Sequence, residues 1–318
     1  MTGGNLLNKS LALLFLVVWV ILQAGQSSGK ERSVTILVSD NEEVYSNAIA
    51  GFTAEVDQPV TIYNLEGDVE RAPALMARIL QERPLLIFAL GAKAAVVSKV
   101  WTKDHPEIPV IFAMVLNWER YNLLKGQENI AGIAYDIAPG THLANLAMIS
   151  PESNRIGIIY SKENSGNLVE SARRSAEIFN MKVVARTIDT PGEFQRVFKS
   201  LEDDIDSFWI LPDPVVYTLD NISWLEKRCL TDRIICLGPS KNVAKLGVVL
   251  SVDPDLKNIG VQAASMARSI LEYKQQPWKI GVMAPIGTRL FINLRTANKI
   301  GLRIGQSALD QATQVIDQ

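Results

Sequence analysis

The stretch NRIGIIYSKENSG, residues 154–166, changes from apolar to polar halfway along. Ile156 to Tyr160 predict a short buried strand, and the polar residues 161–166 precede a helical pattern. Helix N-termini present free backbone N–H groups, so polar side chains there either cap the helix or contact a ligand. Asn164 and Ser165 fit both interpretations equally well, and the choice between capping and binding stays open at this stage.

Other apolar runs end in similar groups of small or polar residues, namely Ser39-Asp40-Asn41, Gly91-Ala92-Lys93, Leu211-Pro212-Asp213, Gly238-Pro239-Ser240 and Asp253. Each group alone is more often turn chemistry than a binding site. In open parallel sheets, however, ligands bind outside the carboxyl ends of the strands. Together these residues predict the two facing walls of one cleft, which hinged closure would seal around a small ligand.

Residues that hold metals or catalyse reactions are scarce. His105 and His142 belong to no cluster with metal-ligand spacing, and we expect solvated or helix-capping roles for both. Neither a P-loop nor a G-x-G-x-x-G pattern occurs. The sequence therefore predicts no catalytic residue, no metal and no cofactor, and it makes an enzyme the least favoured class.

Cys229 and Cys236 are the two cysteines of the chain, at the end of a predicted helix and on the following strand. Two cysteines form no disulfide framework. An oxidising compartment would permit a bridge between them, but two buried free thiols are the favoured interpretation.

Composition and charge narrow the class of protein. The chain has 318 residues, of which 47% are hydrophobic and 21% charged, so two domains with sizeable cores are expected. A formal net charge of −2 argues against a nucleic-acid partner, because nucleic acids bind basic surfaces.

The N-terminus has the pattern of an export signal. Lys9 precedes the apolar run 11–22, and small residues follow. This run is shorter than the roughly 20 residues that a membrane-spanning helix needs. Residues 1–29 are therefore predicted to be a signal peptide that directs the protein to the periplasm. The alternative is an uncleaved anchor in the inner membrane formed by residues 11–22, because Gln and Leu interrupt the small residues near the cleavage site.

Strand-like and helix-like segments alternate along the rest of the chain. Strands are predicted at 34–39, 60–64, 85–90, 110–114, 156–160, 182–187, 207–211, 233–237 and 247–251. Helices are predicted at 42–56, 69–82, 92–103, 164–180, 190–202, 218–229 and 255–273. Repeated strand–helix units predict parallel sheets with right-handed crossovers, and hence an α/β fold.

The two halves of the chain also resemble each other. The segment at 36–40 aligns with 158–162, 87–91 with 209–213, and 110–114 with 234–238. This near-constant offset predicts two Rossmann-like lobes with an inter-lobe cleft. We assign residues 30–145 plus about 254–280 to the first lobe, and 146–253 plus about 281–318 to the second.

Longer segments carry a resemblance to a known family. They are NRIGIIYSKENSGNLVESARRSAEIFNMKVV, SFWILPDPVVYTL, DPDLKNIGVQAASMARSIL and FINLRTANKIGLRI, together with the steps ENIAGIAYDI and LGAKAA. From about residue 33 to 316 the chain resembles ABC-transporter substrate-binding proteins that carry amino acids, which have the type I periplasmic-binding-protein fold. Met114-Val115-Leu116 is more apolar than the turn of that family, and Ala92 replaces a frequent hydroxyl residue.

The resemblance implies a non-enzymatic, exported solute receptor. It would close on a small amino-acid-like ligand and deliver it to an ABC permease in the inner membrane, and it would be a monomer. Carried over by position, the implied ligand contacts are Ser39, Ala92, Tyr135, Tyr160, Asn164, Ser165, Asp213 and Asp253. The alternative is a ligand-sensing or interaction module of the cell envelope that kept the fold without transport, which the apolar turn at 114–116 motivates.

Overall fold

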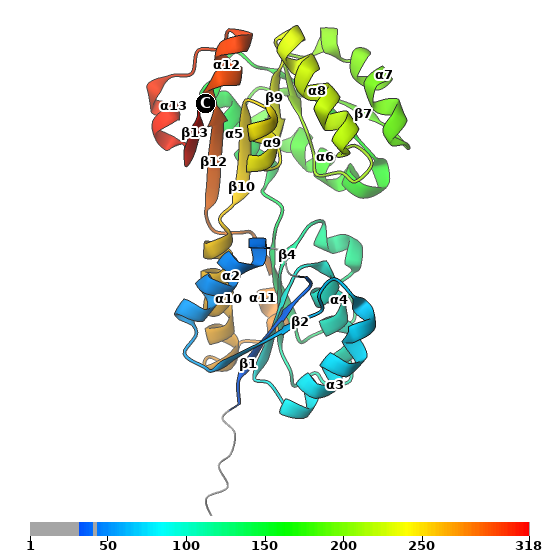
Figure 1. Cartoon of the computed structure of the whole chain (residues 1–318), viewed down its shortest axis with the longest axis vertical. Coiled ribbons are helices and arrows are strands. Elements are labelled where there is room, and N and C mark those ends of the chain that lie inside the picture. The colour runs from blue at the N-terminus through cyan, green and yellow to red at the C-terminus, as the bar shows by residue number, and fades with distance from the viewer. Residues whose placement is uncertain (1–31, 41–42, 318) are drawn as a thin grey trace, which may run out of the picture. The chain divides into compact units, whose positions relative to one another are not determined.

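The computed structural model describes residues 32–40 and 43–317 (Figure 1). The predicted signal peptide, and the alternative anchor at 11–22, lie outside the described residues. From Ser33 onward the chain forms one compact unit. Within the described ranges, no helix combines the length and the apolar character needed to cross a membrane.

The first sheet has six parallel strands in the order β11-β5-β4-β3-β1-β2. Their bounds are β1 Val34–Val38, β2 Val60–Asn64, β3 Leu86–Leu90, β4 Val110–Val115, β5 Ile130–Ala134 and β11 Val282–Met283. The side chains of β1 and β3 are buried on both faces of the sheet, as expected for central parallel strands.

The second sheet has seven strands in the order β13-β12-β10-β9-β8-β6-β7. Their bounds are β6 Arg155–Tyr160, β7 Lys182–Thr187, β8 Ser207–Trp209, β9 Ile235–Gly238, β10 Leu250–Pro254, β12 Thr288–Asn293 and β13 Gln314–Ile316. Only the pairing of β10 with β12 is antiparallel in this described sheet.

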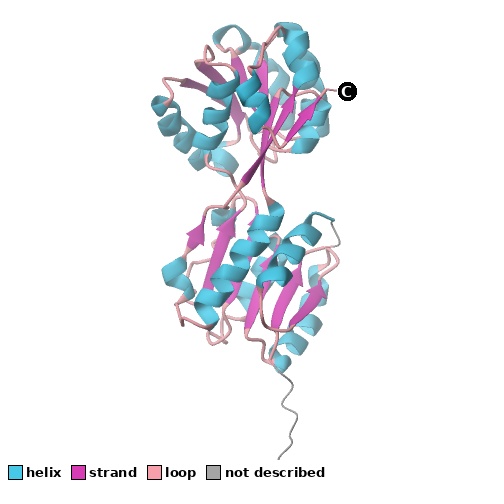
Figure 2. Ribbon diagram, turned by 90° about the vertical axis from the view of Figure 1, so that its left-hand side faces the viewer, coloured by secondary structure: helices cyan, strands magenta, loops and turns pink. Residues whose placement is uncertain are grey.

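Helices cover both faces of each sheet (Figure 2). The first sheet carries α2 Glu43–Glu55, α3 Ala72–Glu82, α4 Ala92–Trp101, α10 Leu256–Leu271 and α11 Pro277–Ile280. The second carries α5 Pro139–Ile149, α6 Lys162–Ile178, α7 Phe194–Lys199, α8 Leu219–Asp232, α9 Lys241–Leu246, α12 Leu294–Ile300 and α13 Gln306–Gln311. Short 3-10 turns complete the set at Val69–Arg71, Trp118–Tyr121, Pro191–Glu193 and Glu202–Asp204. The predicted class, two mainly parallel α/β lobes, is therefore confirmed.

Two glycines let the late helix α10 return to the first sheet. A Cβ at Gly260 would lie 2.0 Å from the Ala48 carbonyl oxygen, and one at Gly51 would lie 2.1 Å from that of Lys257. Only glycine permits this close approach of α2 and α10. The chain leaves the first sheet after β5, returns with α10 and β11, and leaves again with β12. The assignment of residues to the two lobes stays a prediction.

Several elements are absent from those expected from the sequence: β5, β11, β12, β13, α5, α9, α11, α12 and α13. β5 reads IAGIA, and its central Gly132 lies against Phe112, whose ring would be 2.3 Å from an added Cβ. Small residues that accommodate a neighbouring ring give little strand signal, because β-propensity depends on side-chain packing.

The favoured interpretation of the cysteines as free thiols is wrong. Cys229 on α8 and Cys236 on β9 form a disulfide, with their Cα atoms 6.4 Å apart. The chain reverses between them at Arg233, which ends α8 in the left-handed region at φ 57°. This sharp turn brings the two cysteines within bridging distance.

Candidate ligand-binding pocket

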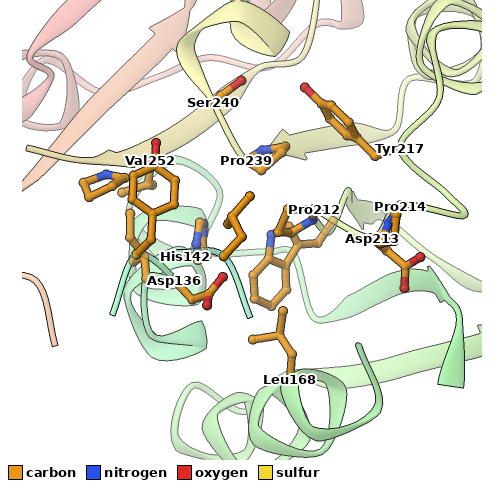
Figure 3. Close-up of a pocket in the computed structure, with 15 residues that line it drawn as sticks. Asp136, His142, Leu168, Pro212, Asp213, Pro214, Tyr217, Pro239, Ser240 and Val252 are labelled. Atoms are coloured by element: carbon orange, nitrogen blue, oxygen red, sulfur yellow. The ribbon is translucent and has the colours of Figure 1, made fainter. Parts of the chain in front are cut away.

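A pocket of about 300 Å³ lies at the carboxyl ends of several strands (Figure 3). A pocket of this volume suits a small molecule. Residues from both halves of the chain line it: Leu116, Tyr135, Asp136, Ile137, His142, Leu168, Trp209, Pro212, Asp213, Pro214, Tyr217, Pro239, Ser240, Val252 and Pro254.

Each part of the lining is positioned by a strand end or by the helix that follows. Leu116 comes directly after β4, and residues 135–137 connect β5 to α5. Residues 212–217 connect β8 to α8, while Pro239 and Ser240 connect β9 to α9. The pocket therefore lies where the sequence led us to expect a site, at the carboxyl ends of parallel strands.

His142 and Trp209 form the aromatic floor of the pocket. Their ring centroids are 4.7 Å apart, and only 6% and 2% of the two residues is exposed. Burial lowers the pKa of His142 to about 4, so the ring is neutral at pH 7. The expected solvated or capping role is therefore wrong for His142. The solvated role fits His105, whose side chain is 43% exposed and whose ring lies 3.2 Å from the Glu107 carboxylate.

Asp213 is fully buried and already has several protein donors. Its carboxylate accepts hydrogen bonds from the Ser161 backbone N–H at 2.9 Å, from the Ser161 hydroxyl, and from the Ser165 hydroxyl at 2.7 Å. The Val215 backbone N–H adds a further bond of 2.9 Å. In Figure 3 the carboxylate of Asp213 turns away from the middle of the pocket. The side chain therefore fastens the start of α6 to the β8–α8 connection.

Helix α6 begins earlier than the sequence pattern indicates. Its N-cap is Ser161, and Asn164 and Ser165 lie in its first turn. The Asn164 amide donates to the Ser161 hydroxyl at 2.7 Å. Asn164 and Ser165 are therefore not the N-cap themselves. The polar residues 161–166 do not show by sequence alone at which of them the helix begins.

Asp253, like Asp213, accepts a hydrogen bond at the start of a helix. Both of its carboxylate oxygens accept from the Lys241 backbone N–H at 3.1 Å, at the beginning of α9. Burial raises the pKa of Asp253, while the Lys241 N–H and the nearby charges of Arg289 and Lys241 act in the opposite direction. Its neighbours Val252 and Pro254 line the pocket, whereas Asp253 does not.

Asp136 lines the pocket and differs from both of these carboxylates. One of its oxygens accepts from the Asn117 backbone N–H at 2.9 Å. Burial raises its pKa, and the negative charge of Glu119 adds to this effect. Figure 3 shows Asp136 on the side of the pocket opposite Tyr217 and Ser240.

The loop after β4 holds Asp136 and also contacts the second half of the chain. Asn117 donates from its side chain to the Asn164 carbonyl oxygen at 2.6 Å. Both Met114 and Asn117 have positive φ, 59° and 47°. Positive φ is unfavourable for a methionine, and such strain often accompanies functional loops. The apolar turn noted in the sequence thus contributes Leu116 to the pocket.

The first-sheet candidates Ser39 and Ala92 lie outside the pocket lining. The buried Ser39 hydroxyl donates to the Leu90 carbonyl at 2.8 Å and accepts from the Ala94 N–H at 3.0 Å. Ala92 is the half-buried first residue of α4. The Ser39 hydroxyl therefore satisfies an N–H in the first turn of α4, whose N-cap is Gly91, and a ligand contact by Ser39 or Ala92 stays a prediction.

The remaining candidates surround the pocket to different degrees. Tyr135 lines it, as does Asp213. Tyr160 is half-buried and packs against the core beside α6, next to the first turn that holds Asn164 and Ser165. The pocket residues His142, Trp209 and Asp136 were missed by sequence reasoning. Of these three, only Trp209 could have been found from the sequence, because it lies in the predicted strand 207–211 that precedes Asp213.

The comparisons with known proteins identify the family. Residues 51–316 match the family described as ABC transporter substrate binding protein. Because the match covers most of the chain, this protein belongs to that family. It is a family of substrate-binding proteins and not of enzymes, and the resemblance found in the sequence is confirmed. No curated protein matches the chain by sequence.

Solved structures show the same fold at low sequence identity. A ligand-free, open substrate binding protein with adhesive properties from Clostridium difficile, CD0873, has a TM-score of 0.76 and 18% identity, over 90% of this chain and 100% of that one. A domain from Streptococcus pneumonia in complex with L-Trp has a TM-score of 0.61 and 20% identity, over 89% and 100%. A conserved domain protein from Vibrio cholerae has a TM-score of 0.62 and 20% identity, over 90% and 100%. These likenesses establish the type I periplasmic-binding-protein fold.

Proposed function

We propose that this protein is the exported solute-binding component of an ABC importer. It binds a small, amino-acid-like molecule in the pocket around Trp209 and His142 and delivers that molecule to a permease in the inner membrane. The observation that carries the proposal is the pocket itself, at the strand ends of a parallel sheet and lined from both halves of the chain. Family membership supports a small-molecule ligand and a transporter partner.

The lining explains how such a ligand would be held. Trp209, Tyr135 and Tyr217 offer aromatic surface, and Ser240 offers a hydroxyl group. Aromatic rings contribute large apolar contact areas, and a few polar groups then fix the ligand's orientation. The L-Trp complex of the pneumococcal relative is consistent with a ligand of this size.

A thermal-shift screen of amino acids and related amines on the mature protein tests the proposal. A true ligand at about 100 times its dissociation constant adds about 2.7 kcal/mol to the free energy of unfolding. Tyr217→Ala should weaken this stabilisation, because Tyr217 lines the pocket. Tyr273→Ala is the matched control, since Tyr273 is 75% exposed and lies outside the pocket lining.

Two outcomes would contradict the proposal. One is a screen in which no compound raises the melting temperature. The other is a ligand whose stabilisation survives Tyr217→Ala but is lost in Tyr273→Ala, because that ligand would bind elsewhere.

Export has its own test. N-terminal sequencing of protein from the envelope fraction should begin after roughly the first 24–29 residues if the signal peptide is removed. An intact Met1 on protein that resists carbonate extraction would instead establish the anchor at 11–22.

A further inference from the structure

The charged side chains that line the pocket are of one sign. Asp136 and Asp213 are the two charged residues of the described lining, and that lining contains no lysine or arginine. A zwitterionic amino acid presents both an amine and a carboxylate. The protein would have to satisfy that carboxylate with side-chain cations or with free backbone N–H groups.

Two helix starts beside the pocket, those of α6 and α9, already hold carboxylates of the protein. Asp213 bonds to the N-cap and to the first turn of α6 through Ser161 and Ser165. Asp253 bonds to the first N–H of α9. A negative charge beside a helix N-terminus is favourable, so these side chains are stable in place. A second carboxylate near them would meet like-charge repulsion in a partly dehydrated site.

Whereas Asp213 has several hydrogen-bond donors, Asp136 has one among the described residues, the Asn117 backbone N–H. Within the described ranges it makes no ion pair, and the charged residue that acts on it, Glu119, is also negative. A dehydrated carboxylate in an apolar pocket favours a cation beside it. Tyr135 precedes it in the chain and also lines the pocket, and aromatic faces attract cations.

We propose that the solute is an apolar amine, with a protonated nitrogen paired to Asp136 and an aromatic or aliphatic body against Trp209, and that it carries no carboxylate. This rests on the proposed function and narrows its ligand class. The selectivity arises because no lysine or arginine lines the pocket and because Asp213 and Asp253 occupy the starts of α6 and α9, whereas Asp136 has no cation beside it among the described residues.

Calorimetry with two matched pairs tests the inference: tryptamine against L-tryptophan, and phenethylamine against L-phenylalanine. Each amine should bind about 100-fold more tightly than its amino acid, a difference of about 2.7 kcal/mol.

Asp136→Asn should weaken amine binding by about 30- to 100-fold and leave the weak affinity for the neutral probe indole nearly unchanged. Asp104→Asn is the matched control, since it removes the same charge from an exposed position outside the pocket lining.

The other outcomes separate the inference from the proposed function. Tighter binding of the amino acids overturns the inference and leaves the proposed function standing. Indole binding as tightly as tryptamine, or equal loss in both aspartate variants, removes Asp136 from the site. If none of these probes binds while the thermal-shift screen finds a ligand without a cationic group, the inference is again wrong. A screen without any ligand overturns the proposed function and this inference together.

Discussion

In both sheets, a helix begins where a strand ends, and its first backbone N–H groups need hydrogen-bond acceptors. The two sheets supply different acceptors. At α4 of the first sheet, the Ala94 N–H donates to the neutral hydroxyl of Ser39. At α6 of the second sheet, the corresponding region is tied by the buried carboxylate of Asp213. A hydroxyl satisfies one N–H without adding charge, whereas a buried carboxylate needs several donors and repels a second anion.

This difference teaches that a strand end with polar residues is not automatically a ligand site. Ser39, Asp213 and Asp253 all match the pattern expected of ligand contacts, yet each already bonds to a backbone N–H of the protein. Asp136 was not among the expected contacts. It also accepts from a backbone N–H, but it has no cation beside it among the described residues, and it lies after β5 in a connection between the two sheets. Four substitutions test this comparison.

The largest effect is expected for Asp213→Ala. It leaves the Ser161 N–H, the Ser165 hydroxyl and the Val215 N–H without an acceptor in a buried region. Since each unpaired donor costs about 1–3 kcal/mol, the free energy of unfolding should fall by about 3–5 kcal/mol without any ligand present. Urea denaturation measures this. A loss below about 1 kcal/mol would mean that Asp213 is held for a ligand and not for the fold.

The next effect concerns pH. The pKa of His142 is about 4 in the folded protein and about 6.5 in the unfolded chain, so the unfolded chain takes up the proton first. The stability present above pH 6.5 is therefore lost as the pH falls toward 4. Between pH 7 and 4.5, wild type should lose about 2–3 kcal/mol more of its free energy of unfolding than His142→Phe does. Denaturation curves at both pH values measure the difference.

His105 supplies the control for that measurement. Because the His105 side chain is 43% exposed and contacts the Glu107 carboxylate, His105→Gln should keep the pH dependence of wild type. If His142→Phe also kept it, His142 would not be buried in solution as it is in the structure.

Ser39→Ala should have a smaller effect than Asp213→Ala. It removes one acceptor for the Ala94 N–H and one donor to the Leu90 carbonyl. Loss of such a cap lowers the free energy of unfolding by about 1–2 kcal/mol. Thermal and urea unfolding should show this beside Ser46→Ala, an exposed serine with a local bond to Glu43, which should change almost nothing. An equal loss for Ser39→Ala and Asp213→Ala would erase the contrast between the two sheets.

The smallest effect is a gain for Asp136→Asn. Burial raises the pKa of Asp136 above its unfolded value, so the stabilising contribution of the protonated form is lost as the pH rises through the raised pKa. At pH 7 the ionised group therefore opposes folding. The isosteric amide keeps an oxygen acceptor for Asn117 and should add up to about 1 kcal/mol to the free energy of unfolding of the ligand-free protein.

The gain from Asp136→Asn should shrink as the pH falls below the unfolded pKa, where wild type is protonated as well. Asp104→Asn should produce no gain at any pH. A loss of stability at pH 7 in Asp136→Asn would show that the carboxylate is well paired in the free protein, and would weaken its assignment as the partner of a cation.

The sequence by itself determined the architecture. Short Val- and Ile-rich runs such as 34–38 and 156–160 have no polar face, which is possible only for strands covered on both sides. Their alternation with amphipathic helices required parallel sheets, and the repeated offset between the halves required two of them. These are local signals, repeated along the chain, and each is readable without knowing what lies across the fold.

Only the tertiary structure decided which polar groups are free to meet a ligand. Asp213 and Ser161 are 52 residues apart, and Asn117 reaches Asn164 over 47 residues. The burial of His142 under Trp209 and the bridge between Cys229 and Cys236 likewise depend on where the chain turns back. A residue's type shows what it can bind, but its partner is set by packing between distant segments, and that packing is not encoded in any local pattern.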